Sequence, residues 1–249
     1  MHLIGLGLLF ALGALIALVL LAIPIFLYSL ARGRRAFHAD GIVVRAEFVA
    51  LDSDVGPRLA GPAIVRFSGA FHDEGASGTD VLGMSVRMRK PGDAHAREED
   101  LTVGDQDCLF GTFESFRTAS QDREHTDVSD YLGNQYSSVA VWRVDGLGAG
   151  KLRAIPVEPS PAGPTRVARL DAAIAAGKAT FTIEARDTDE KPLRNIAELR
   201  LVERLPLRGR LLRISMFRNG RGLTPTGFRN GIRAVVYPMS QLARRIRGG

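Results

Sequence analysis

An uncharged N-terminal segment constrains the fold of this chain more than any other feature. From Leu3 to Tyr28 there are 26 residues without a charged side chain, and Leu, Ala and Ile dominate them. An α-helix needs only about 20 apolar residues to cross the hydrocarbon core of a bilayer. The segment therefore predicts a transmembrane anchor, residues 1–30, in front of a single soluble domain, residues 31–249.

A cleaved signal peptide is the alternative interpretation of this segment. Signal peptides have a basic start and a shorter apolar core, but Ser29–Ala31 has some likeness to a cleavage site, so the alternative stays open. Arg32, Arg34 and Arg35 follow at once, and basic residues beside a span remain in the cytoplasm. We therefore expect a single-pass membrane protein whose soluble domain lies in the cytoplasm.

The soluble part has the alternation of short, half-buried strands. From Ile42 to Leu51 apolar side chains recur at alternate positions, and Ala179–Arg186 alternates strictly. A period of two is typical of a strand with one buried face. Seven or eight such strands with turn residues between them predict an antiparallel barrel. The other strands that we expect are 64–67, 84–89, 137–143, 198–202 and 211–217, with helices at 167–176 and from near Gly231 onwards.

Composition excludes several classes of site. The single cysteine, Cys108, rules out an intramolecular disulfide and a zinc cluster built on cysteines, and the five histidines lack metal-ligand spacing. The net charge is +6, and Arg204–Gly249 holds eleven arginines without one Asp or Glu. Such a basic end can bind nucleic acid, anionic lipid or carboxylates. Because apolar residues interleave it regularly, we expect no nucleic acid and predict contact with the membrane.

Near the C-terminus, Arg233 and Tyr237 stand four residues apart in a pattern that predicts a helix. Residues i and i+4 lie one above the other on a helix, so the guanidinium can lie beside the phenol oxygen. A permanent cation there favours phenolate and lowers the pKa of the tyrosine. Phenolate is a rare axial ligand of haem iron, and Pro238 would kink the helix just after it. A core tyrosine with a surface arginine behind it is the alternative.

Two segments early in the soluble part also place polar side chains beside strands. His38 lies three residues after Arg35, just before an outgoing strand. Further on, the string V-R-F-S contains Arg66 and Ser68, and a turn-rich loop leads from it to D-V-L-G-M, which begins at Asp80. Taken singly, these are explained as a turn histidine and an arginine on a solvated strand face.

In chain order, R-x-x-H before a strand, V-R-F-S followed by D-x-x-G, and a terminal R-x-x-x-Y-P resemble the haem catalases. The three segments extend from His38 to Tyr237, nearly the whole soluble part. The resemblance is to small catalase-related proteins, because the long wrapping region and extra helical domain of full-length catalases would not fit. It implies an α+β, mainly β fold: an antiparallel catalase-like β-barrel with flanking helices, preceded by one N-terminal transmembrane helix.

The resemblance also implies haem b as a cofactor and a role for each matched residue. Tyr237 would be the phenolate ligand of the iron, with Arg233 favouring its charge. His38 would be the acid–base residue, and Ser68 would orient its ring. Arg35 and Arg66 would neutralise the propionates, and Phe113 and Phe116 would stack on the porphyrin unless they are plain core aromatics.

One position departs from the catalase pattern. The stretch D-L-T-V-G-D resembles D-L-V-G-N-N with one residue inserted, so that Asp105 stands where catalases have the distal asparagine. An asparagine amide donates a hydrogen bond to bound peroxide, whereas an ionised aspartate only accepts. We keep Asp105 as a candidate catalytic residue and expect inefficient dismutation of hydrogen peroxide.

The resemblance thus predicts a membrane-tethered, haem-dependent catalase- or peroxidase-like oxidoreductase. Its substrate would be hydrogen peroxide or an organic hydroperoxide, and the anchor close to His38 makes lipid hydroperoxides attractive. The protein would contact the membrane through the N-terminal helix and the basic C-terminal region. Self-association into a homo-oligomer is left open. The rival hypothesis is a catalytically degenerate catalase-like barrel that serves as a haem-binding or structural module at the membrane surface.

Overall fold

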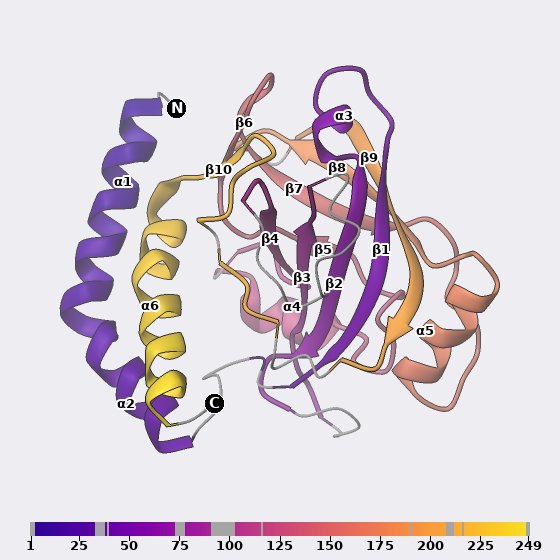
Figure 1. The fold of residues 1–249 in the computed structure, drawn as a ribbon, viewed down its shortest axis with the longest axis horizontal. Coiled ribbons are helices and arrows are strands. Elements are labelled where there is room, and N and C mark those ends of the chain that lie inside the picture. Colours follow the sequence, from indigo (N-terminus) through magenta and orange to yellow (C-terminus); the bar gives the residue numbers. More distant parts are fainter. Residues whose placement is uncertain are drawn as a thin grey trace.

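A β-barrel with helices layered on one side forms the described part of the chain. The computed structural model describes residues 3–32, 38, 40–72, 78–90, 103–115, 117–189, 191–207, 212–215 and 217–247. Within these residues, the C-terminal helix lies beside the barrel and the N-terminal helix lies outside it (Figure 1).

Eight of the described strands close into a ring in which each neighbouring pair is antiparallel. Around the barrel they are β7 (Gly148–Pro156), β5 (Tyr136–Ser137), β4 (Gln106–Gly111), β3 (Leu82–Met88), β2 (Gly61–Gly69), β1 (Ile42–Ala50), β9 (Pro192–Leu205) and β8 (Thr180–Arg186). The ring closes where β7 pairs with β8. Beyond β7 the sheet continues through β6 (Trp142–Val144) to β10 (Leu223–Pro225). The antiparallel barrel with flanking helices is therefore confirmed.

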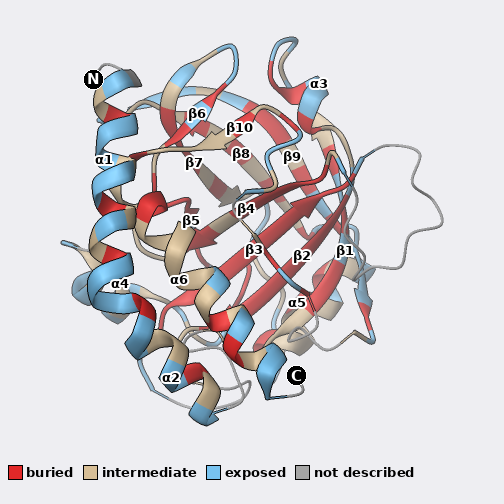
Figure 2. Cartoon of the chain, turned by 60° about the vertical axis from the view of Figure 1, so that its left-hand side comes forward, coloured by how far each residue is buried: buried red, intermediate tan, exposed pale blue. Residues whose placement is uncertain are grey.

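The barrel interior is the main hydrophobic core. On β1, Val44, Ala46 and Phe48 are buried while the residues between them are exposed, as their alternation predicts. Aromatic side chains from several strands and loops meet inside, and the ring centroids of Phe67 and Tyr131 are 4.9 Å apart. Figure 2 shows this burial along the strands, in contrast to the exposed outer side of the N-terminal helix. This packed core supports the strands whose outer face carries the candidate site.

Two long helical segments run side by side along one flank of the barrel. The first consists of α1 (Leu3–Ile16), the π-helical turn η1 (Ala17–Leu21) and α2 (Ala22–Arg32); the second is α6 (Gly227–Ile246). Among the described residues, one helix, Ile4–Arg32, is long and apolar enough to cross a membrane. The shorter helices are α3 (Gly56–Leu59), α4 (Ala119–His125) and α5 (Arg166–Ala175).

Three predicted elements differ in detail, each for a local reason. Helix α6 begins at Gly227, earlier than expected, because this glycine turns the chain with a φ of +76°. The expected strand 137–143 divides into β5 and β6 around Val139, whose φ is +60°. Over the described residues of 211–217 there is no strand, and a side chain rather than a neighbouring strand holds this backbone: Ser215 N–H donates to the Asp107 carboxylate at 2.7 Å.

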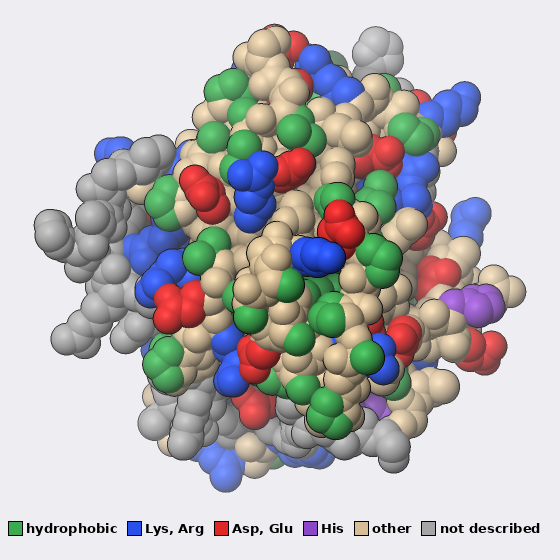
Figure 3. All heavy atoms as spheres, turned by 90° about the vertical axis from the view of Figure 1, so that its right-hand side faces the viewer, with side chains coloured by type: hydrophobic (Ala, Val, Ile, Leu, Met, Phe, Trp, Pro, Cys, Tyr) green, Lys and Arg blue, Asp and Glu red, His purple; other side chains and the backbone are tan. Residues whose placement is uncertain are grey.

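The face of the barrel away from the long helices carries many charged side chains. Figure 3 shows basic and acidic side chains interspersed with apolar ones over it. Exposed ion pairs on β1, β9 and α5 include Arg45–Glu203 and Arg204–Asp171. This face is therefore suited to water, unlike the flank covered by the N-terminal helix.

Candidate functional site

His38 is held in a defined orientation against the outer face of the barrel. Its φ is +54°, a left-handed conformation that histidine adopts more readily than most side chains, and its N–H donates to the Ala70 carbonyl at 3.0 Å. The ring Nδ1 lies 3.1 Å from Ser68 Oγ. On its other side the ring lies against Gly83, where a Cβ would be only 2.5 Å from the imidazole Cε1. The backbone hydrogen bond of His38, the Ser68 hydroxyl and the close approach of Gly83 together fix the orientation of the imidazole ring.

Arg66 supports the His38 segment from beneath. From β2, its Nη1 donates to Ser68 Oγ at 3.1 Å, and its Nη2 donates to the carbonyls of His38 and Asp40 at 2.7 and 2.8 Å. The side chain is almost fully buried. Burial lowers the pKa of this guanidinium to about 10, although Asp40, Tyr131 and Tyr237 favour its charge. The arginine therefore remains a cation at neutral pH, and its Nε is buried without a hydrogen-bond partner among the described residues.

A pair of glycines forms a recess on the outer face of β3 and β4. Gly83 pairs with Gly111 across the two strands. A Cβ on Gly111 would lie 2.9 Å from the ring of Phe113, just as one on Gly83 would meet His38. Glycine within a strand often marks such a close approach by another group. Two rings thus lie on adjacent, bare backbone, and the structure brings His38, Ser68 and Phe113 to one place.

Helix α6 is held over this flank by hydrogen bonds to barrel loops. Arg229 donates to the carbonyl of Val139, Asn230 donates to that of Val141 at 2.8 Å, and Gln241 donates to that of Ile214 at 3.0 Å. These contacts hold both ends of the helix that carries Tyr237. Tyr237 lies on α6 between Asn230 and Gln241, and it is one of the groups that favour the charge of Arg66.

Arg233 lies one helical turn before Tyr237, as its spacing predicts. Its Nη1 is buried and has no hydrogen-bond partner within the described residues, so it does not bond to the phenol in this structure. Pro238 lies inside α6, which continues to Ile246. A buried guanidinium nitrogen without an acceptor is costly, and it leaves a donor available for an anion.

The structure does not bring Asp105 to His38. The Asp105 carboxylate accepts the Lys90 N–H at 3.2 Å, next to Gln106 at the start of β4, whereas His38 lies beside Gly111 and Gly83 at the opposite end. A strand rises about 3.4 Å per residue, so the five steps from Gln106 to Gly111 separate the two ends by roughly 17 Å. Two further predicted site residues, Arg35 and Phe116, lie outside the described residues.

Two structural features of the site were not assigned from sequence. Asp80 of D-x-x-G is buried and accepts the backbone N–H groups of Phe71, His72 and Val81, which closes the loop after V-R-F-S. Gly83 of the same motif makes room for the histidine. A glycine immediately before the predicted strand 84–89 was the available signal, but its partner ring could not be named from it.

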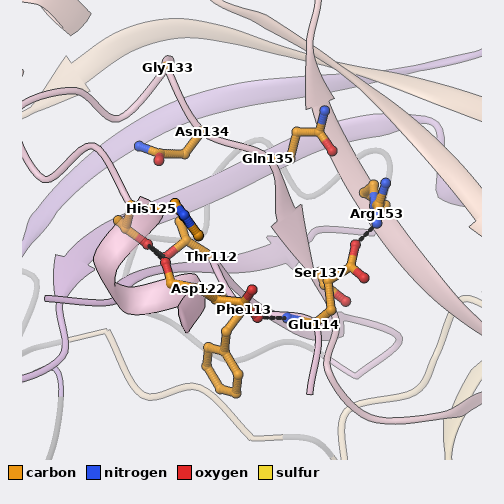
Figure 4. A pocket seen from close by; sticks show the side chains of 12 residues that line it. Thr112, Phe113, Glu114, Asp122, His125, Gly133, Asn134, Gln135, Ser137 and Arg153 are labelled. Atoms are coloured by element: carbon orange, nitrogen blue, oxygen red, sulfur yellow. Dashed lines mark hydrogen bonds and ion pairs between the residues drawn. The ribbon is translucent and has the colours of Figure 1, made fainter. Parts of the chain in front are cut away.

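A cleft of about 320 Å³ opens beside the recess. It shares Gly111 and Phe113 with the recess, and the Phe113 ring points away from the polar groups above it (Figure 4). Glu114 and Arg153 form an ion pair on its wall, and the Glu114 N–H donates to Asp122 at 3.0 Å. The recess therefore lies next to a polar cleft that is open to solvent.

Comparison with known proteins shows the fold. No protein-family model and no curated protein matches the sequence. Among solved structures, a bacterial catalase aligns with a TM-score of 0.53 and 11% sequence identity over 85% of this chain and 57% of the catalase chain. The chain therefore has a catalase-like fold and spans a little over half the length of that protein.

Proposed function

We propose that the protein binds haem b between the outer face of β2–β4 and helix α6, and that it metabolises peroxides. The observation that carries the proposal is the fixed position of His38 on one side and of the helix that carries Tyr237 on the other. Ser68 and Arg66 hold the His38 imidazole on the barrel side, and Asn230 and Gln241 hold helix α6 to barrel loops on the same flank. An imidazole and a phenol in this relation are suited to the two faces of one planar cofactor.

The chemistry of the surrounding groups fits this cofactor. The His38 and Phe113 rings, which lie against Gly83 and Gly111, offer two flat groups on the barrel side to a planar macrocycle. Two buried N–H groups, Arg66 Nε and Arg233 Nη1, have no acceptor among the described residues. A phenolate on Tyr237 and the propionates of haem are acceptors of the right charge. Tyr237 would ligate the iron, Arg233 would stabilise the phenolate, and Arg35, Arg66, Phe113 and Phe116 would hold the macrocycle.

When bound, the haem would supply the redox chemistry at its iron, while the protein supplies ligand, orientation and proton transfer. Ser68 Oγ has two acceptor positions, so it can accept both Arg66 Nη1–H and His38 Nδ1–H. That tautomer leaves His38 Nε2 as a base. It would take the proton from one peroxide oxygen and return it to the departing oxygen, first as general base and then as general acid.

Asp105 favours a second candidate function. Its carboxylate lies at the far end of β4 from His38, so it supplies no distal donor to a bound peroxide. In that case the barrel would bind haem without efficient turnover of hydrogen peroxide, as a haem-binding or structural module at the membrane. Lipid hydroperoxides remain the preferred substrate class of the proposal, because His38 follows the apolar helix closely in the sequence.

The absorption spectrum of the full chain, purified in detergent after expression with added haem, tests the proposal. We expect a Soret band, loss or displacement of that band in Tyr237→Phe, and an unchanged band in Tyr28→Phe, which alters an exposed tyrosine. His38→Ala should keep the band and lose peroxide consumption. Absence of any Soret band would overturn haem binding, and an unchanged spectrum in Tyr237→Phe would overturn the ligand.

The membrane location rests on the one long apolar helix, Ile4–Arg32. Arg32 and the arginines after it favour a location of the domain on the cytoplasmic side. Contact with the membrane through this helix and the basic C-terminal region, and self-association, remain proposals. Protease protection in sealed vesicles separates a cytoplasmic domain from an exported one.

A further inference from the structure

The N-terminal helix is closely packed on α6. A Cβ on Gly231 would overlap the carbonyl oxygen of Phe10, and one on Gly13 would overlap that of Phe228, so the two backbones touch where both helices have glycine. Such small residues allow close helix contact, as they do between helices in membranes. The N-terminal helix and α6 therefore form one packed pair.

The pair is joined along its whole length. Ser29 and Ser240 share a buried hydrogen bond of 2.9 Å, and Arg247 donates to the carbonyls of Leu30 and Ala31. The contacts ascend together in both helices, so the two run parallel, as Figure 1 shows. The N-terminal helix is the longer of the two, and it lies beside α6 over the length of α6.

The side of the N-terminal helix that does not touch α6 is an apolar surface. It supplies twelve of the 21 large hydrophobic side chains that are exposed in the described chain. Figure 2 shows most of the surface of α1 and α2 as exposed, interrupted by buried positions. Isolated surface hydrophobics need no explanation, but an apolar surface of this extent indicates a partner. Its members are Ile4, Leu8, Leu9, Leu12, Leu15, Leu18, Val19, Leu20, Leu21, Ile23, Leu27 and Tyr28.

The charges beside this surface identify the partner. Arg245 and Arg247 are exposed at the end of α6, next to the end of α2, where Arg32 is exposed as well. The sequence has no Asp or Glu after Glu203. An apolar surface that ends in exposed arginines is complementary to a bilayer with anionic headgroups, because such lipids attract basic residues beside the membrane.

The docked helix cannot cross the bilayer. If it did, α6 would lie at the same depth and carry Arg229 and Arg233 into the hydrocarbon, where charged side chains are costly. The barrel beside it, with its mixed charges, would follow (Figure 3). Crossing therefore requires that the helix leave α6 and lose the contacts at Gly13, Gly231 and Ser29.

We propose that the N-terminal helix, docked on α6, lies in the plane of an anionic membrane. Its exposed apolar side chains enter the upper acyl region, the arginines at the ends of α2 and α6 meet the headgroups, and the barrel faces water. The helix that carries Tyr237 then lies directly behind the membrane-bound helix. This proposal does not depend on haem.

Depth measurements on the full chain test it. A fluorophore is attached to Ile4→Cys, Leu18→Cys or Leu27→Cys, and the protein is bound to vesicles of phosphatidylcholine and phosphatidylglycerol that carry quenchers near the headgroup or near the bilayer centre. The native Cys108 is fully buried, so the unsubstituted protein should take no label. We expect all three positions to be quenched more strongly by the shallow probe. A transbilayer helix would place position 18 deepest and quench it most through the central probe, which would overturn the proposal.

Two glycine variants test whether the packing of the N-terminal helix on α6 keeps this helix in the plane of the membrane. Gly231→Leu overlaps the backbone of the N-terminal helix, whereas Gly7→Leu meets nothing within 4 Å. In the first variant we expect the depth at position 18 to differ from that at 4 and 27, and in the second we expect the flat profile. An identical profile in both variants, or wild-type protein that forms dimers and ignores the vesicles, would refute the in-plane arrangement.

Discussion

The imidazole of His38 occupies space that exists only because residue 83 is glycine. A Cβ at that position would lie 2.5 Å from Cε1 and 2.8 Å from Nδ1 of the ring. The ring cannot retreat easily, because Ser68 holds Nδ1 and Arg66 holds the His38 carbonyl. The pair therefore couples a backbone position on β3 to the orientation of the proposed acid–base residue.

Gly83→Ala should displace the His38 ring without removing it. Loss of a positioned general acid–base group lowers a rate by about 10²- to 10⁴-fold, and we expect a fall in kcat for peroxide within that range. The Soret absorbance should persist, since Tyr237 is untouched. Gly7→Ala, at a site open to solvent, serves as the control. Turnover equal to wild type in Gly83→Ala would show that the ring orientation has no catalytic role.

Ser68→Ala should have a smaller effect of the same kind. It removes a hydroxyl that lies 3.1 Å from both His38 Nδ1 and Arg66 Nη1. A hydrogen bond is worth about 0.5–1.5 kcal/mol, so kcat should fall by roughly two- to tenfold, and the acid limb of the pH–rate profile should move. Ser53→Ala, on an exposed turn, is the comparison. A profile identical to wild type would argue against Ser68 as the orienting group.

Local sequence patterns predicted the helices and strands, but the pairing of strands distant in sequence determined which residues meet at the candidate site. The alternation in β1 and β8 was sufficient to identify half-buried strands, because a period of two is a local signal. The position of Asp105 could not be predicted in this way, because its distance from His38 depends on the register of β3 with β4, where Gly83 pairs with Gly111. Register follows from the packing of whole strands and cannot be read from one motif.

The N-terminal helix illustrates the same limit. Its length and composition predict a span, and nothing local to Leu3–Tyr28 indicates the packing on α6. That packing depends on Gly231, more than 200 residues away, and on the hydrogen bond between Ser29 and Ser240. Likewise, the split between β5 and β6 follows from the positive φ of Val139, which a β-branched residue rarely adopts.

A buried ion cluster outside the barrel should dominate local stability. The Asp107 carboxylate accepts Arg87 Nε at 2.9 Å and also pairs with Arg218, and both the Asp107 and Arg87 side chains are fully buried. Asp107→Ala leaves a buried arginine uncompensated and should lower the free energy of unfolding by about 3–5 kcal/mol. Glu203→Ala removes one partner of the exposed Arg45 pair and should cost no more than about 1 kcal/mol.

Urea unfolding, followed through the fluorescence of the single, buried Trp142, measures both variants. Equal effects of the two substitutions would show that burial does not set the value of these pairs. The comparison is direct because each variant removes one carboxylate that pairs with an arginine.

The single thiol predicts a dependence of stability on alkaline pH. Burial raises the pKa of Cys108, and the neighbouring Asp107 carboxylate adds to the shift. The folded thiol keeps its proton where the unfolded thiol, with a pKa of about 8.5, has lost it. The unfolded state then binds fewer protons, so this contribution is fully present below about pH 8.5 and is lost as the pH rises.

Between about pH 9.5 and 10.5, the free energy of unfolding of the wild type should therefore fall by about 1.4 kcal/mol per pH unit more steeply than that of Cys108→Ala. Urea midpoints across this range measure the two slopes. The variant starts from a lower stability at neutral pH because it leaves a small cavity in the barrel core, but the slope is independent of that offset. Parallel curves for the two proteins would mean that Cys108 ionises equally in both states, and a thiol reagent would then label the folded protein.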